Sequence, residues 1–291
     1  MSTPAKSVPL FADIDDVARR LAETGYLPDT ATATAVFLAD RLDKPLLVEG
    51  PAGVGKTELA RAVAQCTGSE LVRLQCYEGV DEARALYEWN HAKQILRIQS
   101  GSSDWDQTRD DVFSEEFLLS RPLLTAIRRT DPTVLLIDET DKADIEIEGL
   151  LLEVLSDFAV TVPELGTITA TRKPFVVLTS NATRELSEAL KRRCLFLHID
   201  FPDADLERRI LLSRVPELPE KMAEELVRII GVLRGMQLKK VPSVAETIDW
   251  GRTVLALGMD TVDDATVAAT LGAVLKHQSD QQKASGELRL N

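Results

Sequence analysis

Short apolar runs recur through the first two thirds of the chain and alternate with stretches of helical periodicity. The run at 134–137, Val-Leu-Leu-Ile, contains no polar residue, which predicts a strand buried on both faces. Strands alternating with helices predict an α/β fold, a parallel sheet with helices on both faces. We expect five strands at 46–48, 71–76, 134–137, 175–178 and 195–199, and helices over 14–21, 30–42, 59–66, 117–128, 147–158 and 185–193.

The pattern changes after Pro202, where strand-like runs stop. Apolar residues then return only at helical spacing, over 206–214, 223–233, 244–257 and 264–275. A small all-α domain is therefore expected behind the α/β domain. The predicted organisation is a loose N-terminal arm at 1–12, the α/β domain at 13–203, the helical domain at 204–277 and a polar, frayed tail at 278–291.

Two segments of the α/β domain are less regular. Apolar residues at 86–89 and 95–98 flank polar positions, a pattern compatible with a hairpin or a broken helix. The acidic stretch 101–111 is expected to be a mobile surface loop. A loose alternation over 160–172, interrupted by Gly166, predicts a second hairpin.

The stretch from Gly50 to Thr57 fits G-x-x-x-x-G-K-[ST] at every fixed position and lies between a predicted strand and a predicted helix. Glycines let the backbone approach an anion closely, and the helix that follows offers its positive end. An ordinary glycine turn is the alternative, but the full match in this context favours a phosphate-binding loop. The expected nucleotide-binding residues are Gly50, Pro51, Ala52, Gly53, Val54, Gly55, Lys56, Thr57 and Glu58.

Two acids, Asp138 and Glu139, directly follow the apolar run at 134–137. The carboxyl ends of parallel strands face the crevice in which such sheets bind ligands. We expect Asp138 to hold Mg²⁺ together with the hydroxyl of Thr57, and Glu139 to activate the attacking water. The pair alone is equally compatible with a solvated strand end; together with the phosphate loop it predicts hydrolysis of a nucleoside triphosphate.

Asn181 ends the fourth predicted strand, where its amide can reach both the γ-phosphate and the water. An Asn at that place also favours a simple turn. Arg192 and Arg193 precede the fifth strand. They are either a solvated basic helix end or an arginine finger for a neighbouring subunit, and their spacing does not choose between the two.

The bulk composition narrows the class of protein. The 291 residues carry a net charge of −13, which disfavours nucleic acid as the main partner. The three cysteines are scattered and form no C-x-x-C, so neither a disulfide framework nor a zinc site is predicted. The first ten residues lack a secretory pattern and no apolar run approaches membrane-spanning length, so the expected location is the cytoplasm.

The order of these parts resembles that of the AAA+ ATPases, P-loop NTPases with a five-stranded parallel sheet and a helical lid. Within them the chain looks like the MoxR branch, and most like the CoxD-type members associated with carbon monoxide dehydrogenase gene clusters. The likeness rests on LLVEGPAGVGKTELARAVA, LVRLQCYEG, LYEWNHAKQILRIQ, FLLSRPLLTAI, LLIDETDKAD, LLEVLSDFAVTVPELGTI, VVLTSNATRELSEALKRRCLFLHIDFPD and VPSVAETIDW, and covers nearly the whole chain.

The resemblance implies insertions around Trp89 and Ile95 and over 160–169 that face a central pore and touch a client. It also implies a homohexameric ring and an adaptor with a von Willebrand factor A domain. One departure is that 241–246, where many relatives carry a sensor 2 arginine, has none; Arg252 is a candidate replacement. The implied roles are Walker A for Lys56 and Thr57, Walker B for Asp138 and Glu139, sensor 1 for Asn181, and arginine finger for Arg193, with Arg192 as the alternative.

The leading functional hypothesis is an ATP hydrolase that uses Mg²⁺-ATP to remodel a client or mature its metal centre. The CoxD likeness implies molybdenum–copper carbon monoxide dehydrogenase as the client. A motor acting on nucleic acid is a second hypothesis, which the net charge disfavours. A nucleotide-gated scaffold with little hydrolysis is a third, which the intact Asp138–Glu139 pair disfavours.

Overall fold

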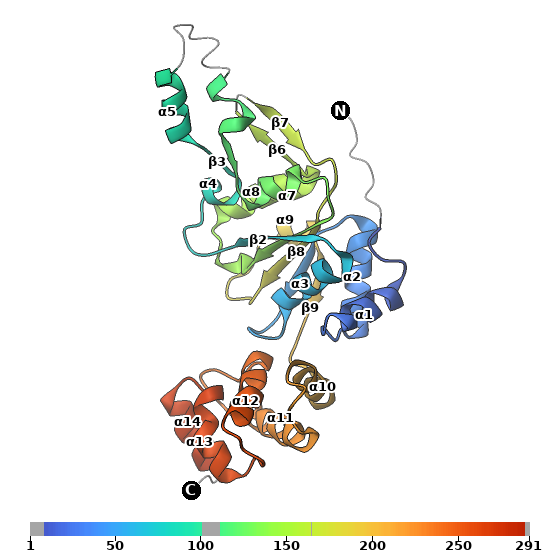
Figure 1. The fold of residues 1–291 in the computed structure, drawn as a ribbon, viewed down its shortest axis with the longest axis vertical. Helices are drawn as coiled ribbons and strands as arrows, with labels where there is room; N and C mark the ends of the chain where they lie inside the picture. Colours follow the sequence, from blue (N-terminus) through green and yellow to red (C-terminus); the bar gives the residue numbers. More distant parts are fainter. Residues whose placement is uncertain (1–8, 101–110, 164, 289–291) are drawn as a thin grey trace.

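The computed structural model of the protein describes residues 9–100, 111–163 and 165–288. A parallel five-stranded sheet in the order β2-β5-β8-β1-β9 lies at its centre (Figure 1). Every strand lies within two residues of a predicted apolar run, which confirms the predicted α/β sheet. The strands are β1 (Leu46–Glu49), β2 (Glu70–Gln75), β5 (Thr133–Asp138), β8 (Phe175–Ser180) and β9 (Leu195–His198).

Alternate side chains of the central strands enter two separate cores, one on each face of the sheet. In β5, Val134 and Leu136 join one core, whereas Leu135 and Ile137 join the other. The first core is covered by α1 (Ile14–Glu23), α2 (Thr30–Leu42) and α3 (Lys56–Thr67), and the second by α7 (Pro122–Arg128), α8 (Ile145–Asp157) and α9 (Glu188–Arg193). Burial on both faces explains why β5 has no polar residue before Asp138.

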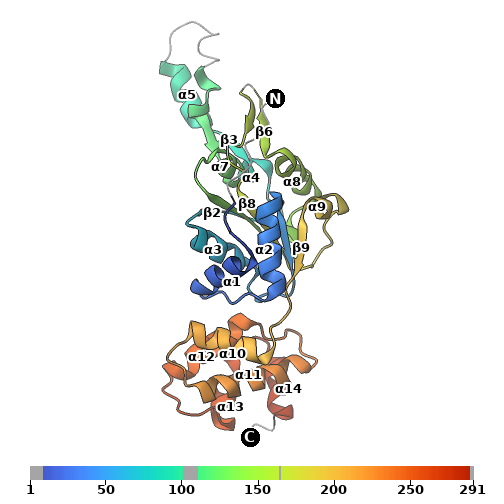
Figure 2. The ribbon, with the colours of Figure 1, turned by 90° about the vertical axis from the view of Figure 1, so that its right-hand side faces the viewer.

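A third core belongs to the helices after β9, which form a separate body below the sheet (Figures 1 and 2). We call this body the lid. Its centre is Trp250, which is fully buried and donates its indole N–H to Thr270 Oγ1 at 2.7 Å. Among the described residues, no helix is long and apolar enough to cross a membrane. The lid helices are α10 (Ala204–Arg214), α11 (Glu220–Gly235), α12 (Val244–Ala256), α13 (Asp264–Val274) and α14 (Gln278–Glu287).

The segment between β2 and α7 follows neither alternative for 86–98, a hairpin or a broken helix, in full, and it differs from the helix predicted over 117–128. The apolar stretch 95–98 lies in helix α5 (His91–Ser100) and is not one arm of a hairpin. Strand β3 (Tyr87–Trp89) pairs instead with β4 (Leu118–Ser120), in a region predicted to start a helix. That helix begins only at Pro122, which has no N–H to donate and is favoured in the first turn. The short helices α4 (Glu82–Ala85) and η1 (Glu115–Phe117) complete this region, and the surface loop predicted at 101–111 falls, except for its last residue, outside the described residues.

The second predicted hairpin is present. Strands β6 (Ala159–Val162) and β7 (Gly166–Thr169) pair in antiparallel register. Helix α5 and the lid lie at opposite ends of the long axis of the molecule (Figures 1 and 2).

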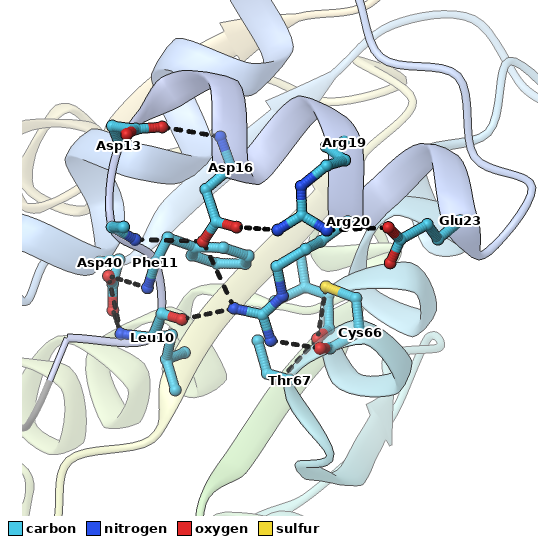
Figure 3. A network of polar contacts seen from close by, with 12 residues as sticks. Leu10, Phe11, Asp13, Asp16, Arg19, Arg20, Glu23, Asp40, Cys66 and Thr67 are labelled. Atoms are coloured by element: carbon cyan, nitrogen blue, oxygen red, sulfur yellow. Dashed lines mark hydrogen bonds and ion pairs between the residues drawn. The ribbon is translucent and has the colours of Figure 1, made fainter.

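Both ends of the described chain are more firmly held than the sequence predicted. Phe11 is 2% exposed, and the amides of Leu10 and Phe11 donate to the Asp40 carboxylate at 3.0 and 3.2 Å. Figure 3 shows this anchor beside Arg20, which bridges Leu10 and Cys66. The predicted arm is therefore not loose over residues 10–12, because a partner thirty positions away fixes it.

The predicted frayed tail is likewise wrong where the structure describes it, since 278–287 form α14. The carboxylate of Asp280 accepts the amides of Lys239 and Lys240 at 3.1 and 3.3 Å, and Ala284 is fully buried. A polar sequence concealed these two anchors.

The N-terminal anchor gives a stability prediction. Asp40→Ala removes the acceptor for two backbone amides and should lower the free energy of unfolding by about 1–2 kcal/mol in denaturant melts. Burial raises the pKa of Asp40, with the amides of Leu10 and Phe11 opposing it, so Asp40→Asn, which keeps a neutral oxygen acceptor, should lose less. Glu23→Ala, which removes only an exposed pair with Arg19, is the control. Equal losses for all three variants would contradict the anchor.

Candidate functional site

A cavity of about 600 Å³ lies between the carboxyl end of the sheet and the lid. Its walls are the loop 52–58, the ends of β5 and β8, the connection 198–203, the turn between α1 and α2, and helices α10 and α12. The volume is typical of a small-molecule site. Apolar residues gather in the wall from the connection and the lid, namely Ile199, Phe201, Leu206, Ile210 and Ile248, whereas the loop and strand ends supply polar groups.

The loop 50–57 wraps tightly against the rest of the fold. Gly50 has φ +155°, and a Cβ there would lie 1.9 Å from the carbonyl oxygen of Ile199. No other residue type fits without moving the backbone. The last two residues of this loop, Lys56 and Thr57, begin α3, and the first turn of that helix, whose N–H groups have no partner within the helix, lines the cavity.

Lys56 is the buried cation of the cavity, with 6% of its surface exposed. Its ammonium donates to the carbonyl oxygens of Gly50 and Pro51, both at 2.7 Å, and to Asn181 Oδ1 at 2.8 Å. Burial lowers the pKa of Lys56, and the carboxylates of Asp141 and Asp138 oppose that shift. The three acceptors match the three donors of an ammonium, and one of them comes from a residue 125 positions away.

Asp138 is almost fully buried and accepts from three sides. Its Oδ1 accepts from Thr57 Oγ1 at 2.9 Å and from Thr179 Oγ1 at 2.6 Å, while Oδ2 pairs with Arg73 at 2.5 Å. Arg73 reaches it from the neighbouring strand β2. The sequence prediction included Thr57 and Asp138 but missed Arg73, which looks like an ordinary solvent-facing residue of a strand.

Glu139 has left-handed backbone with φ +56°, an uncommon conformation that residues at functional sites often adopt. Its N–H donates to Thr179 Oγ1 at 2.9 Å, which fixes the turn after β5. Its carboxylate lines the cavity and pairs with Lys142 at 2.6 Å. Thr179 thus holds both acids, through a donated bond to Asp138 and an accepted bond from Glu139.

Asp141 is a buried acid that the sequence prediction did not single out. It accepts the N–H of Thr183 at 3.0 Å and the Thr183 hydroxyl at 2.5 Å. Burial alone would raise the pKa of Asp141, but the bonds from Thr183 outweigh it and hold the pKa below its usual value. This contact ties the turn after β5 to the segment after β8 that carries Asn181.

Arg192 and Arg193 lie away from this cavity, at the end of α9. Leu195, the first residue of β9, is opposite Leu46, the first residue of β1, whereas the phosphate loop follows the last residue of β1. The two arginines therefore lie at the amino end of the strands, opposite the carboxyl end that carries the phosphate loop. Both are exposed, and Arg193 donates to Ser156 Oγ at 2.6 Å.

The lid presents a different arginine from the one considered on sequence. Arg252 is exposed, pairs with Asp249 at 3.6 Å and does not line the cavity. Residues 241–246 lead into α12 and form its first turn, where Ser243 and Glu246 make a capping box. Arg214, which ends α10, lines the cavity and pairs with Glu58 at 3.3 Å. Its place four residues after Ile210 and eight after Leu206, on the same helix face, is the sequence signal that could have found it.

The oxygen donors at the end of β5 fit Mg²⁺. The Thr57 hydroxyl and the Asp138 carboxylate lie 2.9 Å apart and face the same cavity. Mg²⁺ commonly takes one or two protein oxygens and completes its shell with water and phosphate. In the part of the chain that the structure describes, no group of three His, Cys, Asp or Glu residues could hold a metal by itself.

Residues 46–203, more than half of the chain, match the sequence model of the AAA family, described as ATPases associated with various cellular activities. Similar curated proteins include uncharacterised proteins of Staphylococcus aureus from strain bovine RF122 / ET3-1 and strain COL. Each is 24% identical over 206 residues, which cover 67% of this chain and 70% of the relative.

The double role of Thr179 is testable through stability. Thr179→Val keeps the shape of a side chain that is 1% exposed. It removes the acceptor of the Glu139 amide and one of the donors to the Asp138 carboxylate. The free energy of unfolding should fall by about 1–3 kcal/mol in denaturant melts. Thr167→Val, the same change in the exposed Thr161–Thr167 pair of the β6–β7 hairpin, should stay within about 0.5 kcal/mol. A loss at Thr179 no larger than at Thr167 would refute this role.

Proposed function

Because the chain belongs to the AAA family of ATPases, we propose that it binds Mg²⁺-ATP in the cavity and hydrolyses it at a site completed by a second copy. The observation that carries the proposal is the hydrogen-bonded set around Lys56 and Asp138. It joins the phosphate loop to the ends of β5 and β8 through bonds of 2.8 Å to Asn181 and 2.9 Å to Thr57. These groups line one cavity, which supports the proposal that the phosphate chain of the nucleotide binds among them.

The proposed chemistry requires the residues to exchange partners. Lys56 gives up loop carbonyls and Asn181 for phosphate oxygens, and Asn181 is then free to bond the γ-phosphate and the attacking water. Thr57 and Asp138 hold Mg²⁺, which when bound neutralises charge on the phosphates. Glu139, released from Lys142, orients the water and accepts its proton. The chain thus supplies positioning and charge, the two main contributions to phosphoryl transfer.

The arginines at the opposite edge of the sheet support a shared site. Arg193 is exposed and the sheet separates it from its own phosphate loop. In the proposed ring of identical copies, the end of the sheet that carries Arg193 lies against the cavity of the neighbouring copy. We therefore assign Arg193, with Arg192 as the alternative, as the cation that a neighbouring copy contributes to the γ-phosphate. A homohexamer is the proposed ring.

The proposed output is client remodelling of the MoxR type. Helix α5 exposes Ile95, Leu96 and Ile98 by 55, 65 and 46% at the end of the molecule far from the lid, which suits contact with a client protein (Figure 1). Together with the sequence resemblance, this supports a CoxD-type role in metal-centre maturation. The proposed client is molybdenum–copper carbon monoxide dehydrogenase, and the proposed adaptor carries a von Willebrand factor A domain.

Glu139→Gln tests the hydrolytic assignment. The amide cannot accept the proton of the water, so turnover should fall on the order of 10²–10⁴-fold while ATP affinity stays near that of the wild type. Steady-state phosphate release and equilibrium ATP binding measure the two effects. Wild-type turnover would remove Glu139 from the mechanism.

The same variant, loaded with ATP and used as bait, should retain the client and the adaptor. If it retains duplex DNA or RNA instead, and if nucleic acid stimulates the wild-type turnover in a salt-sensitive way, the protein is a nucleic-acid motor.

Arg193→Ala tests the shared site. Loss of a finger arginine should lower turnover about 10³-fold or more without loss of ATP binding. Mixing with Lys56→Ala, which lacks nucleotide binding but retains Arg193, should restore part of the activity, because each variant supplies the half that the other lacks. Arg208→Ala, which breaks an exposed pair within the lid, is the control. Normal turnover of Arg193→Ala with loss in Arg192→Ala would move the assignment by one residue.

A further inference from the structure

Helix α10 turns one continuous face towards the cavity. Leu206, Ile210 and Arg214 are spaced by four residues, lie on one side of the helix and all line the cavity. They span about 12 Å along the axis at 1.5 Å per residue. The face therefore begins with apolar side chains suited to a base and ends with a cation, the order in which a nucleotide presents its base and its phosphates.

The charge of the cavity makes this cation informative. Among the described residues that line it, six are acidic, namely Asp29, Glu58, Asp138, Glu139, Asp200 and Asp203, and only Lys56 and Arg214 are lysine or arginine. A polyphosphate entering such a cavity needs positive charge on the protein in addition to its own metal ion. Lys56 belongs to the phosphate loop, so Arg214 is the lid residue that can supply positive charge to this cavity.

The present partner of Arg214 can be exchanged at little cost. The Glu58 carboxylate lies 3.3 Å away, with both side chains about a third or more exposed, and such pairs are weak. The other oxygen of Glu58 accepts from Arg61 at 2.8 Å. If Arg214 moves to a phosphate, Glu58 keeps an ion pair with Arg61 and no charge is left alone.

The lid already touches the phosphate loop at a second point. At Gly53, with φ +76°, a Cβ would lie 2.3 Å from Ser243 Oγ, the residue that caps α12. The start of α12 is therefore packed against the loop, while the end of α10 pairs with the first turn of α3. A change of partner at Arg214 acts on a lid that is held to the loop at these two points.

We propose that Arg214 is the lid residue that binds the phosphate chain of the nucleotide, exchanging Glu58 for phosphate oxygens. The inference rests on the proposed function, since it names how the lid of that same site detects its ligand. It places the lid cation at the end of α10 and not in α12, which carries no arginine at its start.

The test measures the affinity of the full-length chain for Mg²⁺-ATP and for adenosine. Arg214→Ala should weaken ATP binding about tenfold to a hundredfold, because a charge-assisted contact is lost, and leave adenosine binding unchanged. Arg214→Lys should fall between. Glu58→Gln should tighten ATP binding about two- to fivefold, because it removes the competing carboxylate. Arg252→Ala should match the wild type.

A purely structural ion pair predicts a different pattern, in which Arg214→Ala and Glu58→Gln weaken ATP and adenosine binding by similar factors. That pattern, or wild-type ATP affinity in a folded Arg214→Ala protein, overturns the inference. The proposed function fails separately: its failure is a wild-type chain that does not bind ATP, or a Lys56→Ala variant that still does. Thermal melts of each variant establish that it is folded.

Discussion

The buried ammonium of Lys56 needs three acceptors, and the arrangement of the cavity follows from that need. A charged group with 6% exposure is tolerable only when its donors are matched. Two acceptors are carbonyls of its own loop, which therefore must curl back, and the tight passage of Gly50 beneath Ile199 allows it. The third is Asn181, which draws the end of β8 to the loop. In the same way, Asp138 at the end of β5 accepts a hydrogen bond from Thr57 and so joins β5 to the loop. The protein alone thus assembles a set of hydrogen-bond partners, which the phosphate chain and the metal ion replace under the proposed function.

The parallel sheet imposes the second constraint. All carboxyl ends of its strands meet at one edge, which gathers Asp138, Glu139 and Asn181 beside the loop. The same geometry sends the residues before each strand to the opposite edge, and Arg193 is there because it precedes β9. No side-chain rotation brings that arginine to its own cavity. Under the proposed function, the topology of a single sheet is therefore what makes hydrolysis depend on a second copy.

What the sequence could predict was local, and what it could not predict was distant. The strands, the phosphate loop and the acid pair follow from apolar runs and from a motif whose residues are contiguous, so their places were predicted to within two residues. Three contacts join segments tens of residues apart: Asp40 holds the amide of Leu10, β4 pairs with β3, and Asp280 holds the amides before α12. Such contacts leave no periodic signal. Asp141 and Arg73 carry no signal of their own in the sequence. Burial next to the site reveals Asp141, and the ion pair with Asp138 reveals Arg73, which is itself exposed.

Under the proposals, the lid and the neighbouring copy both supply positive charge to the cavity. The cavity walls are acidic, and the proposed ligand is a polyanion, so attraction has to come from a few cations. Under the proposals, these cations belong to three bodies: Lys56 to the sheet domain, Arg214 to the lid and Arg193 to the next copy. A ligand that binds all three reduces the distances among them, and loss of its terminal phosphate removes part of that attraction. Under the two proposals, the positions of the lid and the neighbouring copy depend on the charge of the bound nucleotide, so a small chemical step moves large parts of the protein.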